Sequence, residues 1–174
     1  MIENFAIFLD RDGVLIEAPV INGLPKSSHR LEDIKLCKGI EEICKFLKDK
    51  KYKLIMITNQ PDVERGLNSE KNISEINSYL KNKLYLDDLF VCFSDDDRCY
   101  DRKPNPGMLE KASKKHNIDR KKSYFIGDRW RDVEAGKKFG CKTIFIDRKY
   151  NEKLSVHPDY TVENIKEIIA IINK

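Results

Sequence analysis

Short apolar segments alternate with helix-like segments along this chain, and each apolar segment ends abruptly at polar or charged residues. The first runs from Phe5 to Leu9 and the second from Lys53 to Thr58. Between them, apolar residues recur at helical spacing after Gly39, which predicts a crossover helix. Uniformly apolar strands joined by helices are typical of a parallel sheet that is buried on both faces.

The rest of the chain repeats this alternation. It predicts further strands at 89–93, 123–126, 142–146 and 160–162, and helices at 69–84, 106–116, 131–139 and 163–172. The expected fold is α/β, a doubly wound and mostly parallel Rossmann-like sheet with helices on both faces. We expect residues 1–174 to form a single domain without a separate cap domain, because sheet crossovers use most of the chain. The irregular stretch 13–36 is long for a connection and is a candidate substrate loop.

The composition fits a protein with a heavily charged surface. Of 174 residues, 40% are hydrophobic and 36% are charged, and the apolar runs are far too short to span a bilayer. The net charge of +4 is spread through mixed Lys and Glu, so we expect no nucleic-acid partner. The first residues carry no export signal, which predicts cytoplasmic localisation and no membrane partner. A monomer is the simplest expectation, because no exposed apolar face is obvious.

Polar side chains follow the predicted strands at the points where the strands end. Ligands bind at this edge in open α/β sheets, so these residues are candidates for a functional site. Two acidic residues follow the first strand, a basic pair precedes the helix at 106–116, and the other candidates follow the second strand and the strand at 123–126. The set comprises Asp10, Asp12, Thr58, Asn59, Arg102, Lys103, Asp128 and Arg129.

The chemistry of these side chains favours phosphoryl transfer. Two carboxylates at one strand end can act as a nucleophile, Asp10, and as a general acid and base, Asp12. A third carboxylate, Asp128, makes the cluster costly unless a cation offsets its charge, and Mg2+ suits oxygen ligands. The Thr58 hydroxyl and the Lys103 ammonium group are suited to hold the remaining phosphate oxygens. Each motif alone also has an ordinary turn or capping explanation.

Together, the motifs resemble those of the haloacid dehalogenase phosphatases. Four segments match in order: Asp10-x-Asp12-Gly-Val, Thr58-Asn-Gln60, Arg102-Lys103-Pro104 and Gly127-Asp128-x3-Asp132. Within that family, the segments from Thr58 to Gly66 and from Arg102 to Met108 are similar to those of the small histidinol-phosphate and D-glycero-D-manno-heptose 1,7-bisphosphate phosphatases.

The resemblance implies an activity and a role for each residue. The activity is Mg2+-dependent phosphomonoester hydrolysis through an aspartyl-phosphate on Asp10, with Asp12 protonating the leaving alcohol and then activating water. The implied Mg2+ ligands are Asp10, the backbone carbonyl of Asp12, and Asp128. Thr58 and Lys103 would hold the phosphoryl group, and Asp132 would orient Lys103 or a metal-bound water. The implied substrate-binding residues are Asn59, Arg102 and Arg129.

A zinc loop of the family is altered in this chain. Many relatives carry Cys-x-His, a spacer and Cys-x-Cys directly before Arg-Lys-Pro. Here Cys92 and Cys99 remain, while Ser94 and Asp101 replace the histidine and the last cysteine. Structural zinc prefers four thiolate or imidazole ligands, so we expect no structural Zn2+.

Three functions remain open. The first is a phosphatase for a small phosphorylated sugar such as D-glycero-D-manno-heptose 1,7-bisphosphate. The second is a phosphatase for histidinol phosphate or a nucleic-acid 3′ end, with the same catalytic residues. The third is a non-catalytic phosphate-binding protein, which would need neither a positioned nucleophile nor a proton donor.

Overall fold

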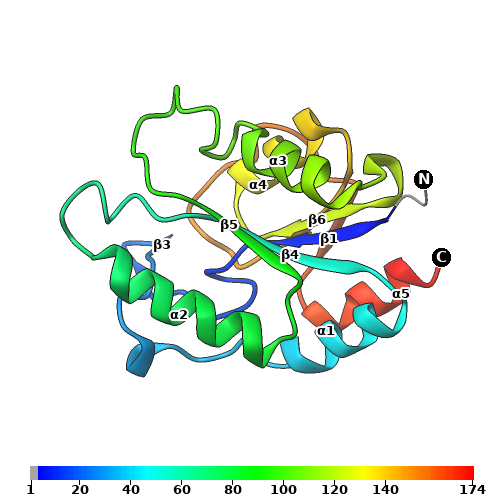
Figure 1. Cartoon of the computed structure of the whole chain (residues 1–174), viewed down its shortest axis with the longest axis horizontal. Helices are drawn as coiled ribbons and strands as arrows, with labels where there is room; N and C mark the ends of the chain where they lie inside the picture. The colour runs from blue at the N-terminus through cyan, green and yellow to red at the C-terminus, as the bar shows by residue number, and fades with distance from the viewer. Residues whose placement is uncertain (1–3) are drawn as a thin grey trace.

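Six parallel strands form the central sheet, in the spatial order β5-β4-β1-β6-β7-β8 (Figure 1). The computed structural model describes residues 4–174. The strands are β1 (Ala6–Leu9), β4 (Lys53–Asn59), β5 (Asp88–Cys92), β6 (Tyr124–Gly127), β7 (Lys142–Ile146) and β8 (Tyr160–Val162). Every pair of neighbours is parallel. The predicted parallel sheet is therefore confirmed.

Helices cover both faces of this sheet. One layer contains α1 (Ile40–Asp49), α2 (Glu70–Lys83) and α5 (Ile168–Ile172), and the other contains α3 (Gly107–His116) and α4 (Trp130–Phe139). On β1, Ile7 and Leu9 pack into the first layer, whereas Ala6 and Phe8 pack into the second. Successive strand residues point to opposite faces, so a strand that is apolar at every position fills two cores at once.

The order of the strands reverses at β1. The chain extends the sheet through β4 and β5 on one side of β1, and then through β6, β7 and β8 on the other side. The carboxyl end of β1 therefore stands at the switch point, where sheets of this type bind ligands. Asp10 is the first residue beyond that end.

Two segments differ from the sequence prediction. The irregular stretch 13–36 contains a small hairpin of β2 (Val20–Ile21) and β3 (Leu24–Pro25). The last predicted helix begins as a 3-10 turn, Ile165–Glu167, before α5. Asn164 caps that turn, because its side chain accepts a hydrogen bond from the Lys166 amide.

Residues 4–174 contain no separate cap domain, as predicted. None of the helices in this range is both long and apolar enough to cross a membrane. Because residues 4–174 contain no cap domain, the loops between strands and helices border the carboxyl edge of the sheet.

The aromatic contacts of Phe8 provide a test of the second core. Phe8 is fully buried and packs edge-on against Phe125 at 6.5 Å and Phe139 at 5.5 Å between ring centroids. Phe8→Ala should lower the free energy of unfolding by about 3–5 kcal/mol, because it removes buried area and leaves a cavity. Urea denaturation measures this change. Tyr85→Ala, at a side chain that is 75% exposed, should change it by no more than about 0.5 kcal/mol, and equal losses for both variants would contradict this description of the core.

Candidate active site

Lys103 lies between two carboxylates at the carboxyl edge of the sheet. Its Nζ is 2.8 Å from Asp10 Oδ1 and 2.7 Å from Asp132 Oδ1. The same atom donates a hydrogen bond to the carbonyl oxygen of Ile57, at 3.0 Å. Lys103 is only 3% exposed, so these contacts are shielded from water. Three acceptors from three segments of the chain therefore fix the ammonium group beside Asp10.

Burial and charge shift the pKa values of this pair. Burial alone would lower the pKa of Lys103, but the charges of Asp10 and Asp132 outweigh it and raise that pKa. Burial, with the charge of Asp132, raises the pKa of Asp10 from 3.8 to about 7, against the lowering effect of Lys103. Lys103 thus stays charged, whereas Asp10 needs further positive charge nearby to be fully ionised at neutral pH.

Asp128 is a buried carboxylate whose two oxygens accept no hydrogen bond from the described residues. It follows β6 and is 1% exposed. Burial, together with the charges of Asp10 and Asp132, raises its pKa well above the ordinary value, and the neighbouring Tyr150 hydroxyl acts in the opposite direction. A buried polar group without a partner is costly, so this carboxylate is suited to a ligand that brings positive charge.

Gly13 makes room for Asp128. It has φ of +86°, and a Cβ there would lie 1.7 Å from Asp128 Oδ2. A larger residue would therefore both strain the turn and displace the carboxylate. Gly13 is needed for the close approach of the Asp128 carboxylate as well as for the turn.

The carboxylates of Asp10, Asp128 and Asp132 fit a hard divalent cation. One oxygen from each lies within 4.8 Å of the others. Asp132 is the least available, because its Oδ1 accepts from Lys103 and its Oδ2 accepts from the Arg129 amide. Asp10 and Asp128 therefore have the freer oxygens, and all-oxygen donors of this kind suit Mg2+.

Asp12 is held by residues to which the sequence analysis assigned no role. Arg11 is completely buried, and its guanidinium donates to Asp12 and to the side chain of Gln60. Gln60 Nε2 in turn donates to Asp12 Oδ2 at 2.8 Å, and the Ser28 amide donates to Asp12 Oδ1. The sequence feature that indicates a role for Arg11 is its position between two aspartates at a strand end. At that position a long charged side chain has no open path to water.

The second strand end supports the first. Thr58 Oγ1 accepts a hydrogen bond from Gln60 Nε2 at 2.8 Å. Asn59, predicted to bind substrate, uses both ends of its amide on the backbone of Lys103: Nδ2 donates to the carbonyl oxygen, and Oδ1 accepts from the amide. In this structure the Asn59 side chain therefore positions Lys103.

The two predicted substrate-binding arginines are both engaged with protein groups. Arg129 pairs with Glu152. Arg102 is 6% exposed, donates to the Ser94 carbonyl at 2.7 Å and pairs with Asp97 at 2.9 Å. Arg102 therefore holds the loop that follows β5, and unlike Arg129 it is absent from the lining of the hollow over Asp10.

That hollow is small and lies directly over the catalytic candidates. Its volume is about 70 Å³, and Arg131, not singled out in the sequence, is one of its basic residues. A hollow of this size suits a phosphoryl group better than a whole sugar. The residues that line it are Asp10, Asp12, Pro25, Lys26, Ser27, Asn59, Lys103, Arg129, Arg131 and Asp132.

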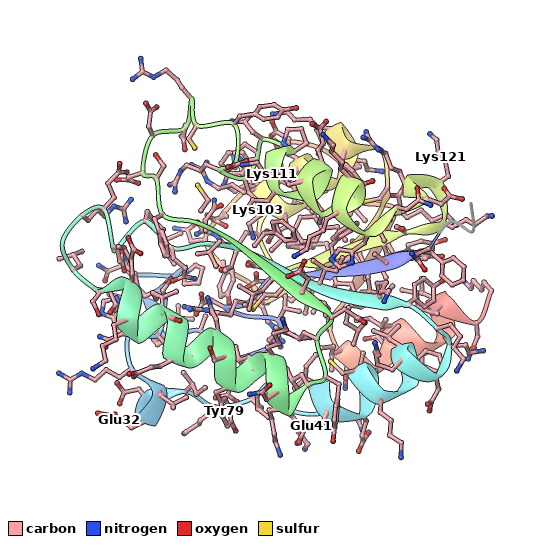
Figure 2. All side chains as sticks on the ribbon, viewed as in Figure 1. Glu32, Glu41, Tyr79, Lys103, Lys111 and Lys121 are labelled. Atoms are coloured by element: carbon pink, nitrogen blue, oxygen red, sulfur yellow. The ribbon has the colours of Figure 1, made fainter. Side chains whose placement is uncertain are left out.

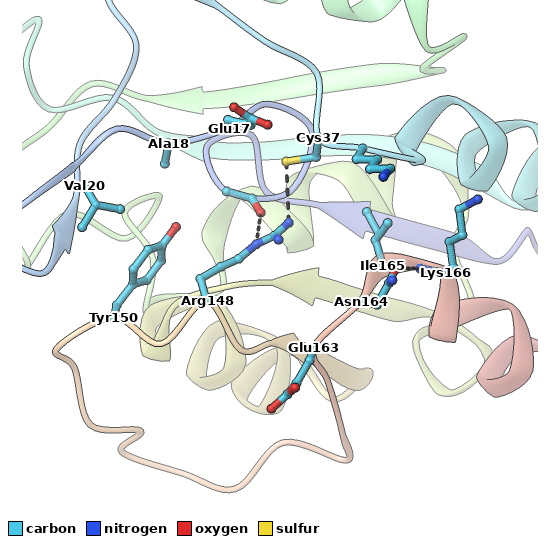
Figure 3. Close-up of a pocket in the computed structure, with 12 residues that line it drawn as sticks. Glu17, Ala18, Val20, Cys37, Arg148, Tyr150, Glu163, Asn164, Ile165 and Lys166 are labelled. Atoms are coloured by element: carbon cyan, nitrogen blue, oxygen red, sulfur yellow. Dashed lines mark hydrogen bonds between the residues drawn. The ribbon is translucent and has the colours of Figure 1, made fainter.

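A wider hollow of about 500 Å³ has Gly13 among its lining residues (Figure 3). Arg148 reaches across it, donating to the Gly13 carbonyl at 3.0 Å and contacting Cys37 Sγ at 3.6 Å. None of the proposed catalytic carboxylates lines this hollow. Arg148 has a structural role at the active site, because it fixes the Gly13 turn that accommodates Asp128.

Comparisons with known proteins identify relatives of this chain. The family model for HAD-like hydrolases matches residues 100–168. D-glycero-alpha-D-manno-heptose-1,7-bisphosphate 7-phosphatase from Campylobacter jejuni is 32% identical over 94% of this chain and 93% of its own length. D-glycero-beta-D-manno-heptose-1,7-bisphosphate 7-phosphatase from Helicobacter pylori is 35% identical over 97% of this chain and 98% of its own.

A solved structure has the same fold. It is a D,D-heptose 1,7-bisphosphate phosphatase from B. bronchiseptica, complexed with magnesium and phosphate. The TM-score is 0.82 at 23% identity, and the match covers 97% of this chain and 98% of the other. The similarity extends over the whole sheet and both helix layers.

The charge cluster predicts how stability depends on pH in the metal-free protein. Asp10 has a folded-state pKa of about 7, above its ordinary 3.8, and the pKa of Asp128 is shifted in the same direction. The folded state therefore binds more protons in this window. The contribution of these groups to stability is complete below about pH 4 and is lost as pH rises through about 7.

Asp128→Asn tests this cluster. In chelator-treated protein, the variant should be more stable than the parent by about 0.5–2 kcal/mol near pH 8, because it removes a buried charge. Below about pH 4 the difference should shrink, because the parent carboxyl is then neutral. Added Mg2+ should raise the melting temperature of the parent but not of the variant. Denaturant titrations and thermal melts measure both effects, and a variant that is destabilised equally at both pH values would contradict the prediction.

Proposed function

The chain belongs to the haloacid dehalogenase-like phosphatases, and we propose that it hydrolyses a sugar bisphosphate with Asp10 as the nucleophile and Mg2+ as the cofactor. The observation that supports this most directly is the pairing of Asp10 with Lys103 beside the unpartnered carboxylate of Asp128. A phosphate-binding protein without activity would gain nothing from two buried acids next to an anion, because they would repel it.

The proposed reaction has two steps. Asp10 attacks phosphorus as the bond to the leaving oxygen breaks, and Asp12 gives its proton to that oxygen. Asp12, now a carboxylate, takes a proton from water, and the water oxygen attacks phosphorus to release phosphate and Asp10. Bound Mg2+ would supply positive charge to the Asp10 and Asp128 carboxylates and a phosphate oxygen.

The remaining residues hold these groups in place. Lys103 would balance the charge of the nucleophile and of the phosphoryl oxygens. Arg11 and Gln60 direct the Asp12 carboxyl, and Thr58 offers its hydroxyl to the phosphoryl group. Both acids are largely shielded from water, because the side chains of Asp10 and Asp12 are 10% and 12% exposed.

A second negative group on the substrate would meet Lys26. Four basic side chains line the hollow, and Lys103, Arg129 and Arg131 pair with carboxylates. Among residues 4–174, Lys26 has no such partner. It lies at the base of the β2–β3 hairpin, where its amide donates to the Pro19 carbonyl, two residues before the Ser28 contact with Asp12. Because Asp12 would protonate the leaving oxygen, we expect Lys26 to face the leaving group.

This charge favours D-glycero-D-manno-heptose 1,7-bisphosphate, the substrate type in the names of the relatives, over the alternatives. Histidinol phosphate carries an amine on the leaving group, which Lys26 would repel. A nucleic acid would need a row of free basic side chains, whereas Arg102, Arg129 and Arg131 are occupied by carboxylates. A sugar with a second phosphate complements the free ammonium group of Lys26 better than histidinol phosphate or a nucleic acid does.

Asp10→Asn tests the nucleophile. The variant should keep its fold, because asparagine has nearly the same shape, and its Mg2+-dependent phosphate release should fall by at least about a thousandfold. The assay follows phosphate release from sugar bisphosphates, sugar monophosphates and histidinol phosphate, with circular dichroism as the control for folding. Unchanged turnover on every substrate would exclude Asp10 as the nucleophile.

Lys26→Gln tests the substrate class. The variant should raise KM for heptose bisphosphate about tenfold, the effect expected from one charge-assisted contact, and leave hydrolysis of p-nitrophenyl phosphate unchanged. Lys121→Gln is the matched control, because Lys121 is exposed near the amino end of β6, far from Lys103 (Figure 2). Equal effects on both substrates would show that Lys26 does not read a second phosphate.

A further inference from the structure

Cys92 and Cys99 lie together at the border of the active site. Cys92 is the last residue of β5, Cys99 lies in the loop that follows, and their Sγ atoms are 3.9 Å apart. Both are free thiols. Two thiols at this separation are close enough to form a disulfide after small side-chain rotations.

The surroundings of the pair supply no set of zinc ligands. Asp101, which stands in place of a family cysteine, pairs with Lys111. Ser94 accepts a hydrogen bond from the Asp96 amide. Among residues 4–174, the cluster of metal-ligating side chains lies at Asp10 instead. The two thiols are therefore left to react with each other.

We propose that Cys92 and Cys99 form a reversible disulfide that braces the loop between β5 and α3. The two thiols differ in access, because Cys92 is 4% exposed whereas Cys99 is partly exposed. A peroxide therefore reaches Cys99 first. Burial also raises the pKa of Cys92 to about 11, which protects it from direct oxidation.

The chemistry balances with a peroxide as the oxidant. The peroxide oxidises the Cys99 thiol to a sulfenic acid and is itself reduced to water. The Cys92 sulfur then attacks the Cys99 sulfur, the S–O bond breaks, and the hydroxyl group leaves as water with the Cys92 proton. A small thiol reverses the reaction by exchange and is oxidised in turn.

The brace would join two points that carry active-site residues. The Cys92 carbonyl accepts from the Gln60 amide, and the Cys99 carbonyl accepts from the Arg102 amide next to Lys103. Between these points, ion pairs hold the loop: Asp95 with Arg65, and Asp97 with Arg131. These pairs are partly exposed and weaken in salt. A disulfide in the same loop does not weaken in salt. In high salt the oxidised loop therefore keeps its position, whereas the reduced loop loosens.

Arg98 provides a direct probe. Its side chain is 92% exposed at the tip of the loop between the two cysteines. Trypsin should cut after Arg98 in the reduced protein, and faster in high salt. After treatment with hydrogen peroxide, cutting should be slower and independent of salt, and the two fragments should stay joined until a reductant is added. The melting temperature should rise by roughly 5–10 °C on oxidation.

Peptide mapping and variants decide the assignment. The intact protein should lose the mass of two hydrogens, with one crosslink between Cys92 and Cys99, while Cys37, Cys44 and Cys141 remain thiols. Cys99→Ser should abolish the crosslink, the mass change and the rise in melting temperature, while it keeps the fold because the side chain is partly exposed. A Cys99 oxidised to sulfinic acid without a crosslink, or purified protein that holds zinc on the pair, would overturn the proposal. These readouts do not depend on phosphatase activity.

Discussion

The buried contact of Lys103 with Asp10 and Asp132 holds the carboxyl edge of the sheet together. Lys103 comes from the loop after β5, Asp10 from the end of β1 and Asp132 from α4, while the carbonyl of Ile57 on β4 accepts from the same ammonium group. Removing one partner of a buried pair leaves an unpaired charge and typically costs about 3–5 kcal/mol. The position of Asp10, the proposed nucleophile, is therefore set by the same interaction that fixes the loops around it.

Much of this arrangement could be predicted from the sequence, because it follows from local pattern. Unbroken apolar runs such as 54–57 predicted the buried parallel strands, and polar residues at the strand ends predicted which side chains meet. The partners of Arg102 and Arg129 could not be predicted, because an arginine in a loop takes whichever carboxylate the fold brings near. The burial of Arg11 was missed for the same reason, since its contacts on α2 and at Ser28, after the hairpin, are distant in sequence.

The site contains features that do not favour stability by themselves. Asp128 has no hydrogen-bond partner among residues 4–174, and Gly13 must adopt positive φ so that this carboxylate can approach. A chain selected only for stability would replace such a buried acid. An unpaired buried carboxylate and a turn at positive φ depart from the rules that favour stability. Such a departure is expected at a site whose ligand supplies the missing positive charge.

The choice of substrate rests on loops rather than on the sheet. The hollow over Asp10 has space for a phosphoryl group, and residues 25–27, at the end of the β2–β3 hairpin, line one part of it. Carboxylates within the protein already neutralise Arg129 and Arg131. These two arginines therefore contribute to the shape of the hollow more than to its free positive charge. We therefore expect the same edge of the sheet to serve other phosphate esters in proteins whose loops line the hollow differently. Substrate identity in this fold is thus a property of the least regular parts of the chain.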